Sequence, residues 1–549
     1  MTRAAGLRHD LHRQYDLPVS TTATATSPAS TFFELVCVWA ERTPAALAVV
    51  SVQGRFGYAA LEQRARRAAA ALHAAGIRRG SRVGLLLANR IEWIDVCLGA
   101  SALGATTVPL STWSTRSELA FLLDDAKLSL LVAQGSFGER DFHADLLALK
   151  DGPGWPRAVW LLDRESTPFT RFAEVVEAAP AAFAVSGADP QSDALVLYTS
   201  GSTSAPKAVP LAQYAVVENA FNIGERQGLV PTDKVLLAAP LFWAYGGANA
   251  LPATLSHGAA LVLLEKFDAG AAIDAIERER CTAIYALPAM SAAIARHPGY
   301  QKQRLASLRT GLTLGSPEEF LSQVEVLGAR ELCNVYGATE TCGNCCVTWH
   351  HWPLDRRARC QGPPLPGQEL RFVDEETGLP VPPGAPGLVE VRGYITRGYQ
   401  GASAQQNAKA FCADGFYRTG DMGRLDADGD FVFVGRVGEM IKRAGINVSP
   451  AELEAVLRRH PSVTDVAVTG VPDAEHAERG ERIVAFVVPR AGERFDAQAL
   501  HVHCAAELSK YKLPDRIEAC NSLPLTVTGK LQRNELKRLA AALAPAHRR

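Results

Sequence analysis

The sequence has no excess of charge of either sign and little cysteine. Its 549 residues include 57 Lys and Arg against 58 Asp and Glu, a formal net charge of −1. This balance excludes a polybasic nucleic-acid binder or an acidic solvating chain as a description of the whole protein. The 11 cysteines are too few and too irregularly spaced for a disulfide scaffold. We therefore expect a reducing compartment and a cytoplasmic protein.

Long apolar runs are absent as well. No stretch of about 18 apolar residues is free of charged or turn-forming residues, so we predict no transmembrane helix. The most apolar region, residues 83–110, is interrupted by Arg90, Glu92 and Asp95. The N-terminus has no continuous apolar stretch of signal-peptide length. Residues 1–30 are predicted to form a flexible leader, because their second half is poor in large apolar side chains.

The composition is otherwise that of a globular protein, with 47% hydrophobic and 21% charged residues. Helical spacing at 61–77 and 93–103 separates short continuous runs of Val, Leu and Ile. Strands that are apolar throughout are typical of parallel sheets covered by helices on both faces, so an α/β fold is predicted. The predicted strands are at 47–52, 82–88, 128–133, 158–163, 234–240 and 259–265.

The pattern changes near residue 370. Pro and Gly cluster at 377–387, and two alternating runs then flank the turn 426–429, which is typical of a β-hairpin. A compact pattern follows, with helices predicted at 451–460 and 500–508 and strands at 463–471 and 482–489. We predict a leader at 1–30, a large domain at 31–437 and a C-terminal domain at 438–549.

One segment combines hydroxyl groups with a lysine. Residues 198–207 read Tyr-Thr-Ser-Gly-Ser-Thr-Ser-Ala-Pro-Lys and follow an apolar run. Hydroxyls and free backbone N–H groups on a loop that leaves a strand can hold phosphate oxygens, and the lysine adds a mobile positive charge. The segment does not match the P-loop pattern GxxxxGK[ST]. By composition alone, an ordinary surface loop rich in Ser and Thr is the alternative.

The wider string YTSGSTSAPKAVPL resembles the phosphate loop YTSGSTGxPKG of the adenylate-forming enzymes, the superfamily of acyl-CoA synthetases, non-ribosomal adenylation domains and luciferase. An ordered series of further motifs makes the resemblance specific, and it covers residues 30–540. These motifs are Asn334–Glu340 (NVYGATE), Tyr417–Asp421 (YRTGD), Gly435-Arg436, Asn447–Glu454 (NVSPAELE) and Thr528–Lys530 (TGK). The sequence is most similar to an acyl- or aryl-CoA ligase.

The resemblance implies both a fold and a reaction. The expected fold is α/β, with a large N-terminal part of layered α/β subdomains, a small β-barrel-like portion and a small, mobile α+β C-terminal lid. The implied reaction uses ATP and Mg²⁺ to convert a carboxylic acid to an acyl-adenylate with release of pyrophosphate, and then transfers the acyl group to coenzyme A. One alternative is loading of a carrier-protein phosphopantetheine. A non-catalytic homologue is another, although the retained Lys207, Glu340, Asp421 and Lys530 argue against it.

By resemblance, the segment after Tyr198 would bind the β- and γ-phosphates, and Thr339 would bind the α-phosphate. Glu340 would be the carboxylate beside Mg²⁺, an ion that is commonly held by one or two carboxylates, phosphate oxygens and water. The predicted phosphate contacts are Thr199, Ser200, Gly201, Ser202, Thr203, Ser204, Lys207 and Thr339, and the predicted metal ligands are Thr203 and Glu340.

The nucleoside contacts follow from the same resemblance. Tyr336 would stack on adenine, Asp421 would accept both ribose hydroxyls, and Arg436 would support the ribose or the phosphates. An ionised carboxylate suits this task because it is an acceptor only. The remaining predicted nucleotide contacts are Gly315, Ser316, Pro317, Asn334 and Gly337.

Lys530 is expected to be catalytic, together with Lys207, Thr339 and Glu340. A lysine is charged at neutral pH, and between the carboxylate and the α-phosphate it would stabilise charge that shifts in the transition state. Because Lys530 lies near the C-terminus, movement of the lid must carry it into the site, with Gly438 as the hinge.

The thiol channel is predicted at Lys442 and Gly445. A glycine there leaves room for the pantetheine arm to pass close to the backbone. Relatives that load carrier proteins share this feature, so it does not choose between coenzyme A and a carrier protein.

The acid pocket is predicted around Trp243. Relatives that activate amino acids commonly have Asp at this position to hold the α-ammonium group, which an indole cannot do. We therefore predict an acid without an α-amino group, and a pocket that Trp243 shortens or re-routes. Asn249 and Asn344 could either read a hydroxyl or carbonyl of the acid or cap secondary structure. The candidate lining residues are Trp243, Tyr245, Gly246, Asn249, Thr313, Gly337, Cys342 and Asn344.

Some residues depart from the pattern of the superfamily. Ser204 and Ala208 replace glycines, which are used where φ is positive or a phosphate approaches closely. The cysteines at 342, 345 and 346 superficially resemble a zinc site. A second CxxC pair is missing, so packed or pocket-lining cysteines are the preferred interpretation.

Overall fold

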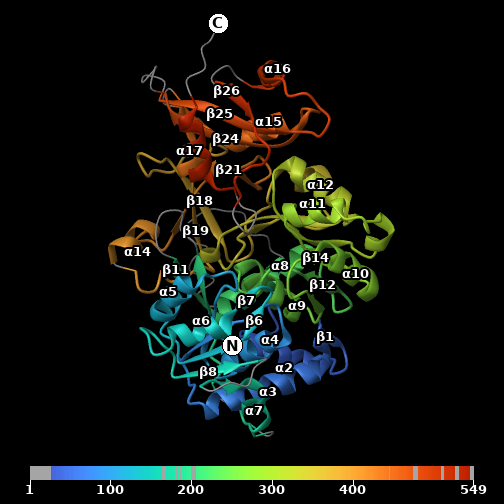
Figure 1. Cartoon of the computed structure of the whole chain (residues 1–549), viewed down its shortest axis with the longest axis vertical. Coiled ribbons are helices and arrows are strands. Elements are labelled where there is room, and N and C mark those ends of the chain that lie inside the picture. Colours follow the sequence, from blue (N-terminus) through green and yellow to red (C-terminus); the bar gives the residue numbers. More distant parts are fainter. Residues whose placement is uncertain are drawn as a thin grey trace.

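The computed structural model describes residues 26–162, 168–180, 183–185, 187–199, 206–402, 404–443, 446–473, 480–508, 512–525 and 531–543. The predicted leader falls largely outside these residues. Most of the chain forms two parallel sheets with helices packed around them, and the C-terminal elements gather at the opposite end from the first helices (Figure 1).

The first sheet has seven strands and carries the start of the Ser/Thr-rich segment. All neighbouring strands are parallel except the edge strand β11, which pairs antiparallel with β10. The strands predicted at 82–88, 128–133 and 158–163 are confirmed here. In spatial order the sheet contains β11 (Lys207–Ala212), β10 (Asp193–Thr199), β4 (Thr106–Pro109), β3 (Arg82–Leu86), β5 (Leu130–Ala133), β8 (Ala158–Leu161) and β9 (Thr170–Arg171).

The second sheet has eight strands and ends at the predicted nucleotide motif. Its six central strands are parallel, and only the two edge strands are antiparallel to their neighbours. In spatial order it contains β17 (Cys346–Val347), β16 (Glu331–Tyr336), β15 (Thr310–Thr313), β14 (Ala283–Tyr285), β12 (Lys234–Leu237), β13 (Ala260–Leu263), β1 (Leu47–Ser51) and β2 (Gly54–Gly57).

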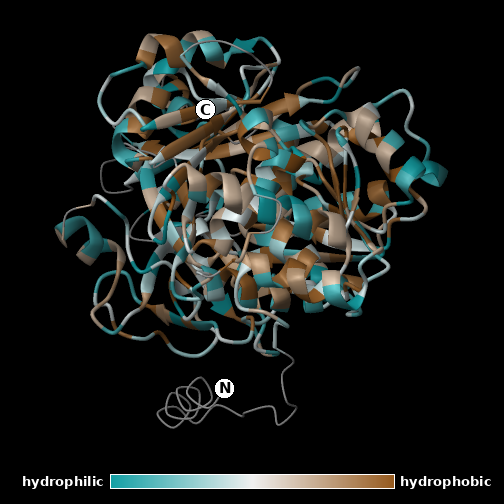
Figure 2. Ribbon diagram, turned by 90° about the horizontal axis from the view of Figure 1, so that it is seen from below, coloured by the Kyte–Doolittle hydropathy of each residue, from teal (hydrophilic) through white to brown (hydrophobic). Residues whose placement is uncertain are grey.

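Helices cover both sheets, and one large buried cluster joins helices α2, α3, α4 and α8 to strands of each sheet. Brown, apolar strands lie inside, whereas many helices show teal faces outward (Figure 2). The α-helices of this part are α2 (Phe32–Arg42), α3 (Tyr58–Ala74), α4 (Ile91–Ala102), α5 (Arg116–Ala126), α6 (Phe142–Leu149), α7 (Phe172–Glu177), α8 (Gln213–Gln227), α9 (Leu251–Ser256), α10 (Ala269–Glu279), α11 (Pro288–Arg296), α12 (Pro317–Leu327), α13 (Leu354–Arg359) and α14 (Ala404–Ala410).

Shorter elements complete the N-terminal part. A π-helix, η2, follows Trp243, and a 3-10 turn, η4, contains Glu340. Their bounds, with those of the remaining short elements, are η2 (Ala244–Ala250), η3 (Lys302–Leu305), η4 (Thr339–Thr341), β6 (Ser136–Phe137) and β7 (Arg140–Asp141).

An antiparallel sheet of four strands follows the two large sheets. Its strand order is β18 (Glu369–Val373), β19 (Gly387–Arg392), β20 (Tyr417–Leu425) and β21 (Phe431–Arg436). The turn between β20 and β21 places Gly429 at φ +79°, a conformation that glycine adopts without strain. The predicted hairpin is therefore confirmed.

The C-terminal part is a small α+β unit with buried clusters of its own. It is the orange and red portion at one end of the molecule (Figure 1). The predicted helices and strands are confirmed. Its elements are η5 (Val437–Glu439), β22 (Ile441–Arg443), β23 (Ile446–Val448), α15 (Pro450–Arg458), β24 (Val463–Pro472), β25 (Glu481–Pro489), α16 (Ala497–Glu507), β26 (Arg516–Ala519) and α17 (Arg533–Ala542).

Among the described residues, three ion pairs join this unit to the N-terminal part, and in one of them Arg458 lies 3.9 Å from Glu319. Arg459 lies 3.3 Å from Glu318 at the start of α12, and Lys442 lies 3.6 Å from Glu375. Across the ranges that the structure describes, no helix is both long enough and apolar enough to cross a membrane.

Candidate functional site

Strands β10 and β11 bring the two ends of the predicted phosphate segment together. Thr199 pairs directly with Lys207 across the antiparallel ladder. The Nζ of Lys207 lies 4.6 Å from the ring centroid of Tyr399, close enough for a cation–π contact. The intervening Ser200, Gly201, Ser202, Thr203 and Ser204 lie outside the described residues.

Ala208, one of the two departures from glycine, sits in ordinary strand geometry. It has no positive φ and is 2% exposed. It bridges to Gln400, whose backbone N–H donates to the carbonyl of Ala208 at 3.0 Å. The methyl group of Ala208 is therefore accommodated without backbone strain.

Tyr399 also reaches Glu340, on the turn η4. Its hydroxyl donates to Oε1 of Glu340 at 2.8 Å, while the carbonyl of Glu340 accepts from the N–H of Thr396. Burial and the nearby carboxylate raise the pKa of Tyr399, so the hydroxyl stays protonated and remains a donor. One tyrosine thus gathers two predicted residues, Lys207 and Glu340. Sequence reasoning missed it, because nothing marks a lone tyrosine 59 positions from its partner.

The chemistry of Glu340 fits Mg²⁺. Its side chain is buried, and among the residues that the structure describes its second carboxylate oxygen accepts no hydrogen bond. A carboxylate oxygen with unused lone pairs is a ligand type that Mg²⁺ prefers. The predicted partner ligand, Thr203, is outside the described residues.

The described part of the chain supports the preferred interpretation of the cysteines. Its only cluster of three or more potential metal ligands within 4.8 Å of one another consists of Asp426, Asp428 and Asp430. These belong to the hairpin turn, where the exposed Asp428 pairs with Arg359 and the buried Asp430 pairs with Arg356. The cysteines at 342, 345 and 346 are buried and free.

Replacement of Tyr399 by Phe tests this arrangement. The change keeps the ring under Lys207 and removes the donor to Glu340. A hydrogen bond to a charged group contributes about 1.5–3 kcal/mol, so we expect kcat/KM for ATP to fall by roughly tenfold to a hundredfold. Tyr300→Phe is the matched control, because its hydroxyl donates to the carbonyl of Val326 away from the site. Equal activities of the two variants would contradict the role of Tyr399.

The predicted nucleoside residues form a second cluster. The hydroxyl of Tyr336 donates to Oδ2 of Asp421 at 2.8 Å, and Nε of Arg436 donates to Oδ1 at 2.9 Å. The ring of Tyr336 lies against Phe431, with centroids 4.3 Å apart. Strands β16, β20 and β21 thus bring together three residues that are far apart in the sequence.

A pH dependence follows from the burial of Asp421. Burial raises the pKa of its carboxyl group, and Arg436 and Tyr336 offset only part of that effect. The ionised form accepts hydrogen bonds, so ATP affinity should fall with decreasing pH, starting above the ordinary aspartate value of about 3.9. We expect the KM for ATP to rise as the pH falls, and we expect this rise to be absent in Asp421→Asn. The KM for the carboxylic acid substrate should not show the same rise. If it does, another group is responsible.

The remaining predicted nucleotide residues have mixed environments. Ser316 forms a capping box with Glu319, and Pro317 begins α12, so both organise the helix start beside Gly315. Asn334 is fully buried, and its amide donates to the carbonyls of Arg357 and Cys360. The side chain of Asn334 therefore holds protein backbone, a role that its place in the motif did not reveal.

The segment predicted to begin the acid pocket, residues 240–246, runs into the π-helix η2. Trp243 precedes it and packs edge-on against Trp113, with centroids 5.1 Å apart. The hydroxyl of Tyr245 bonds to the carbonyl of Leu312, so it is directed at protein. Gly246 is required for packing, since a Cβ there would lie 2.3 Å from the carbonyl oxygen of Pro240.

The other predicted lining residues converge on the turn after η4. A Cβ on Gly343 would lie 2.5 Å from the amide atoms of Asn249, and one on Gly337 would lie 2.4 Å from Cα of Asn344. Cys342 is fully buried at φ +54°, and burial raises the pKa of its thiol. The hydroxyl of Thr313 donates to the side-chain oxygen of Gln323.

Only some of the site residues predicted in the C-terminal part are among the described residues. Lys530 and Gly445 lie outside the described residues, whereas Leu525 and Leu531, on either side of 526–530, pair in a β-bridge. Gly438 lies in η5, and a Cβ there would meet nothing within 4 Å. In this conformation the predicted hinge position would accept a larger residue.

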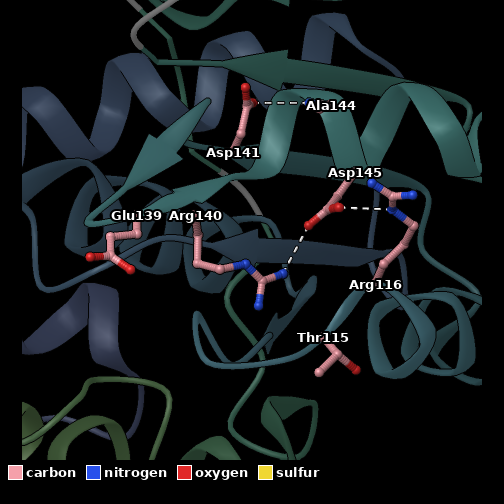
Figure 3. Close-up of a pocket in the computed structure, with 7 residues that line it drawn as sticks. All are labelled: Thr115, Arg116, Glu139, Arg140, Asp141, Ala144 and Asp145. Atoms are coloured by element: carbon pink, nitrogen blue, oxygen red, sulfur yellow. Dashed lines mark hydrogen bonds and ion pairs between the residues drawn. The ribbon is translucent and has the colours of Figure 1, made fainter.

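A separate open pocket lies near α5 and α6 (Figure 3). Both of its arginines, Arg116 and Arg140, bond to Asp145. None of the predicted site residues lines it, and its positive charge is already matched by protein carboxylate. The lining residues are Thr115, Arg116, Glu139, Arg140, Asp141, Ala144 and Asp145.

Comparison with known proteins identifies the family. Residues 37–400 match the family described as AMP-binding enzyme, and residues 452–530 match the AMP-binding enzyme C-terminal domain. The chain belongs to the AMP-binding enzyme family. This membership confirms the resemblance that the motifs indicated.

Full-length relatives of this AMP-binding enzyme include CoA ligases. It is 35% identical over 497 residues to the indoleacetate–CoA ligase of Aromatoleum aromaticum, covering 88% of this chain and 93% of the relative. It is 33% identical over 507 residues to a feruloyl-CoA synthase of an Amycolatopsis species, covering 91% and 97%.

Solved structures confirm the predicted architecture of this AMP-binding enzyme. ATP-bound MatB from Rhodopseudomonas palustris matches with a TM-score of 0.83 at 26% identity, covering 93% of this chain and 99% of that one. The anthranilate CoA ligase AuaEII with anthranoyl-AMP matches with a TM-score of 0.83 at 25% identity, covering 95% and 99%.

Proposed function

We propose that the protein activates a carboxylic acid without an α-amino group and transfers the acyl group to coenzyme A. ATP supplies the adenylyl group, and Mg²⁺ accompanies it. The observation that carries the proposal is the cluster of Lys207, Tyr399 and Glu340 at the ends of the phosphate segment. The names of the relatives, CoA ligases and a CoA synthase, support the same activity.

In the first half-reaction, a carboxylate oxygen bonds to the α-phosphorus, and the bond to the pyrophosphate oxygen breaks with its electron pair. Thr199 and Lys207 bracket the segment that binds the outgoing phosphates. When bound at Glu340, Mg²⁺ neutralises phosphate charge and polarises the phosphorus. Asp421 orients the ribose through its remaining lone pairs. Each of these groups is positioned before reaction by partners within the protein.

In the second half-reaction, the thiol sulfur bonds to the acyl carbon and AMP leaves. We propose that residues 438–549 act as a lid that turns about Gly438, presenting Lys530 for adenylation and Gly445 for thiol transfer. The ion pairs between the proposed lid and Glu318, Glu319 and Glu375 are partly exposed. Such pairs contribute about 0–1 kcal/mol, so they can open without large cost.

We propose an acid without an ammonium group because Trp243 carries no negative charge that could pair with such a group. An indole packed against Trp113 provides apolar surface. For the location of the enzyme we propose the cytoplasm, since all eleven cysteines are free thiols, as expected in a reducing compartment.

Acid-dependent release of pyrophosphate from ATP tests the proposal. A panel of aliphatic, aromatic and α-amino acids should give release with some members of the first two classes and none of the third. Addition of coenzyme A should yield the acyl thioester and AMP. If the same acid is transferred only to a holo-carrier protein, the carrier-loading alternative holds. If no acid of the panel causes pyrophosphate release, the non-catalytic alternative is favoured.

A further inference from the structure

Two buried asparagines beside the predicted acid pocket have side-chain atoms without hydrogen-bond partners. Both amide atoms of Asn249 and the Nδ2 of Asn344 are buried and unpaired. The residues are 1% and 5% exposed, respectively. An unpaired buried polar group is costly, and native proteins retain few of them without a reason. Since neither atom of the Asn249 amide has a partner, that residue does not cap secondary structure.

The two asparagines lie in neighbouring segments. Asn249 is near the end of the π-helix η2, a rare form that is frequent at functional sites. Its amide lies over the backbone of Gly343, where even a Cβ would come within 2.5 Å of both amide atoms. Asn344 is the next residue along. At position 343 only glycine permits the amide of Asn249 to lie this close to the backbone, because any other residue has a Cβ. Gly343 also has φ +96°.

Several other polar groups of the same region bond within the protein, although Oε1 of the neighbouring Gln368 is also buried without a partner. The amide of Asn219 donates to the carbonyls of Cys342 and Asn344, and its oxygen accepts from Gln368. Tyr245 and Thr313 also bond to protein groups. The unpaired atoms are therefore confined to Asn249 and Asn344 among the predicted acid-pocket residues that the structure describes.

We propose that these two amides read a hydroxyl group on the acyl part of the substrate, remote from the carboxylate. The unpaired set consists of one acceptor atom, Oδ1 of Asn249, and two donor nitrogens, Nδ2 of Asn249 and Nδ2 of Asn344, each of which carries two N–H groups. A hydroxyl offers one donor and two acceptor lone pairs, so it matches this set. A carbonyl would leave Oδ1 of Asn249 unpaired, and an ammonium group would leave both donors unpaired. The proposal rests on the proposed function and narrows its substrate class to hydroxylated acids.

Matched pairs of acids test the proposal, each pair sharing one carbon skeleton with and without a hydroxyl. The readout is kcat/KM for acid-dependent pyrophosphate release by the full chain. A site built to bond a substrate hydroxyl discriminates strongly against the analogue that lacks it, so we expect a preference of at least about a hundredfold in the pairs that are accepted. Asn249→Leu should reduce this ratio to about tenfold or less by lowering turnover of the hydroxylated member, and Asn344→Leu should act in the same direction.

Asn222→Leu is the matched control. Asn222 is a buried asparagine of α8 whose amide donates to the carbonyls of Glu218 and Pro366. Its loss should lower the thermal midpoint and leave the hydroxyl preference unchanged. Asn249→Leu removes an amide that has no partner, so its thermal midpoint should equal or exceed that of the wild type.

Three outcomes overturn the proposal. Equal turnover of both members in every accepted pair means that the amides bind water only, while the proposed function stands. If Asn249→Leu changes kcat/KM by the same factor for both members of a pair, the residue acts on packing and does not bind the hydroxyl. Absence of pyrophosphate release with every acid removes the proposed function, and this inference with it.

Discussion

Lys530→Ala should slow adenylation by about a hundredfold to a thousandfold while leaving thiol transfer largely intact. In the adenylation step two anions approach each other, and the ammonium group offsets charge that builds up between the carboxylate and the α-phosphate. Removing one such electrostatic contact commonly costs about a hundredfold to a thousandfold in rate. Acid-dependent exchange of pyrophosphate into ATP measures this step alone. Transfer from a chemically prepared acyl-adenylate to coenzyme A measures the other, which Lys530→Ala should leave close to the wild-type rate.

The control for this variant is Lys512→Ala, in the same C-terminal part. Lys512 bonds to the side chain of Glu452 within that part, so its loss changes charge by the same amount. It should leave both half-reactions within about threefold of the wild type, because an exposed pair of this kind contributes at most about 1 kcal/mol. Loss of both half-reactions in Lys530→Ala would point to a folding defect and contradict a role limited to adenylation.

The α/β class and many individual strands and helices could be predicted from local sequence patterns, whereas the layered architecture and the lid followed from the family resemblance. Apolar runs such as 82–88 and 234–240 became central strands of the two parallel sheets, because only strands buried on both faces tolerate such runs. The hairpin at 426–429 was equally accessible, since its turn residues determine it locally. Strand ends were less predictable, because they depend on which neighbouring strand supplies hydrogen bonds.

Contacts within the site were less accessible from sequence. Tyr336 and Asp421 belong to recognisable motifs, yet their hydrogen bond joins positions 85 residues apart and depends on how the sheets are placed. Tyr399 lies in none of the quoted motifs. Asn334 lies in one, but its amide bonds inward. A motif therefore predicts that residues are near a site, whereas the direction of each side chain depends on tertiary packing.

Glu340→Gln should give the second large effect, a loss of roughly a hundredfold to a thousandfold in kcat/KM for ATP. The substitution is nearly isosteric, and the amide oxygen can still accept from Tyr399. It removes the negative charge that fits Mg²⁺, whose stabilisation of developing phosphate charge contributes several kcal/mol. Activity as a function of Mg²⁺ concentration is the direct measurement. The variant should need a higher concentration to reach its own maximum, whereas a purely structural role would leave that dependence unchanged.

Glu390→Gln separates loss of a buried charge from loss of the metal ligand. Glu390 is 4% exposed, close to the 7% of Glu340, and is held by Arg371 and Arg418. Neutralising Glu390 removes the negative charge that pairs with those guanidinium groups, so the thermal midpoint of the variant should fall. Its activity should keep the Mg²⁺ dependence of the wild type. Glu340→Gln should show the reverse pattern. The carboxylate of Glu340 has a tyrosine hydroxyl as its side-chain partner. Folding should therefore depend on its charge only weakly, whereas catalysis should depend on it strongly.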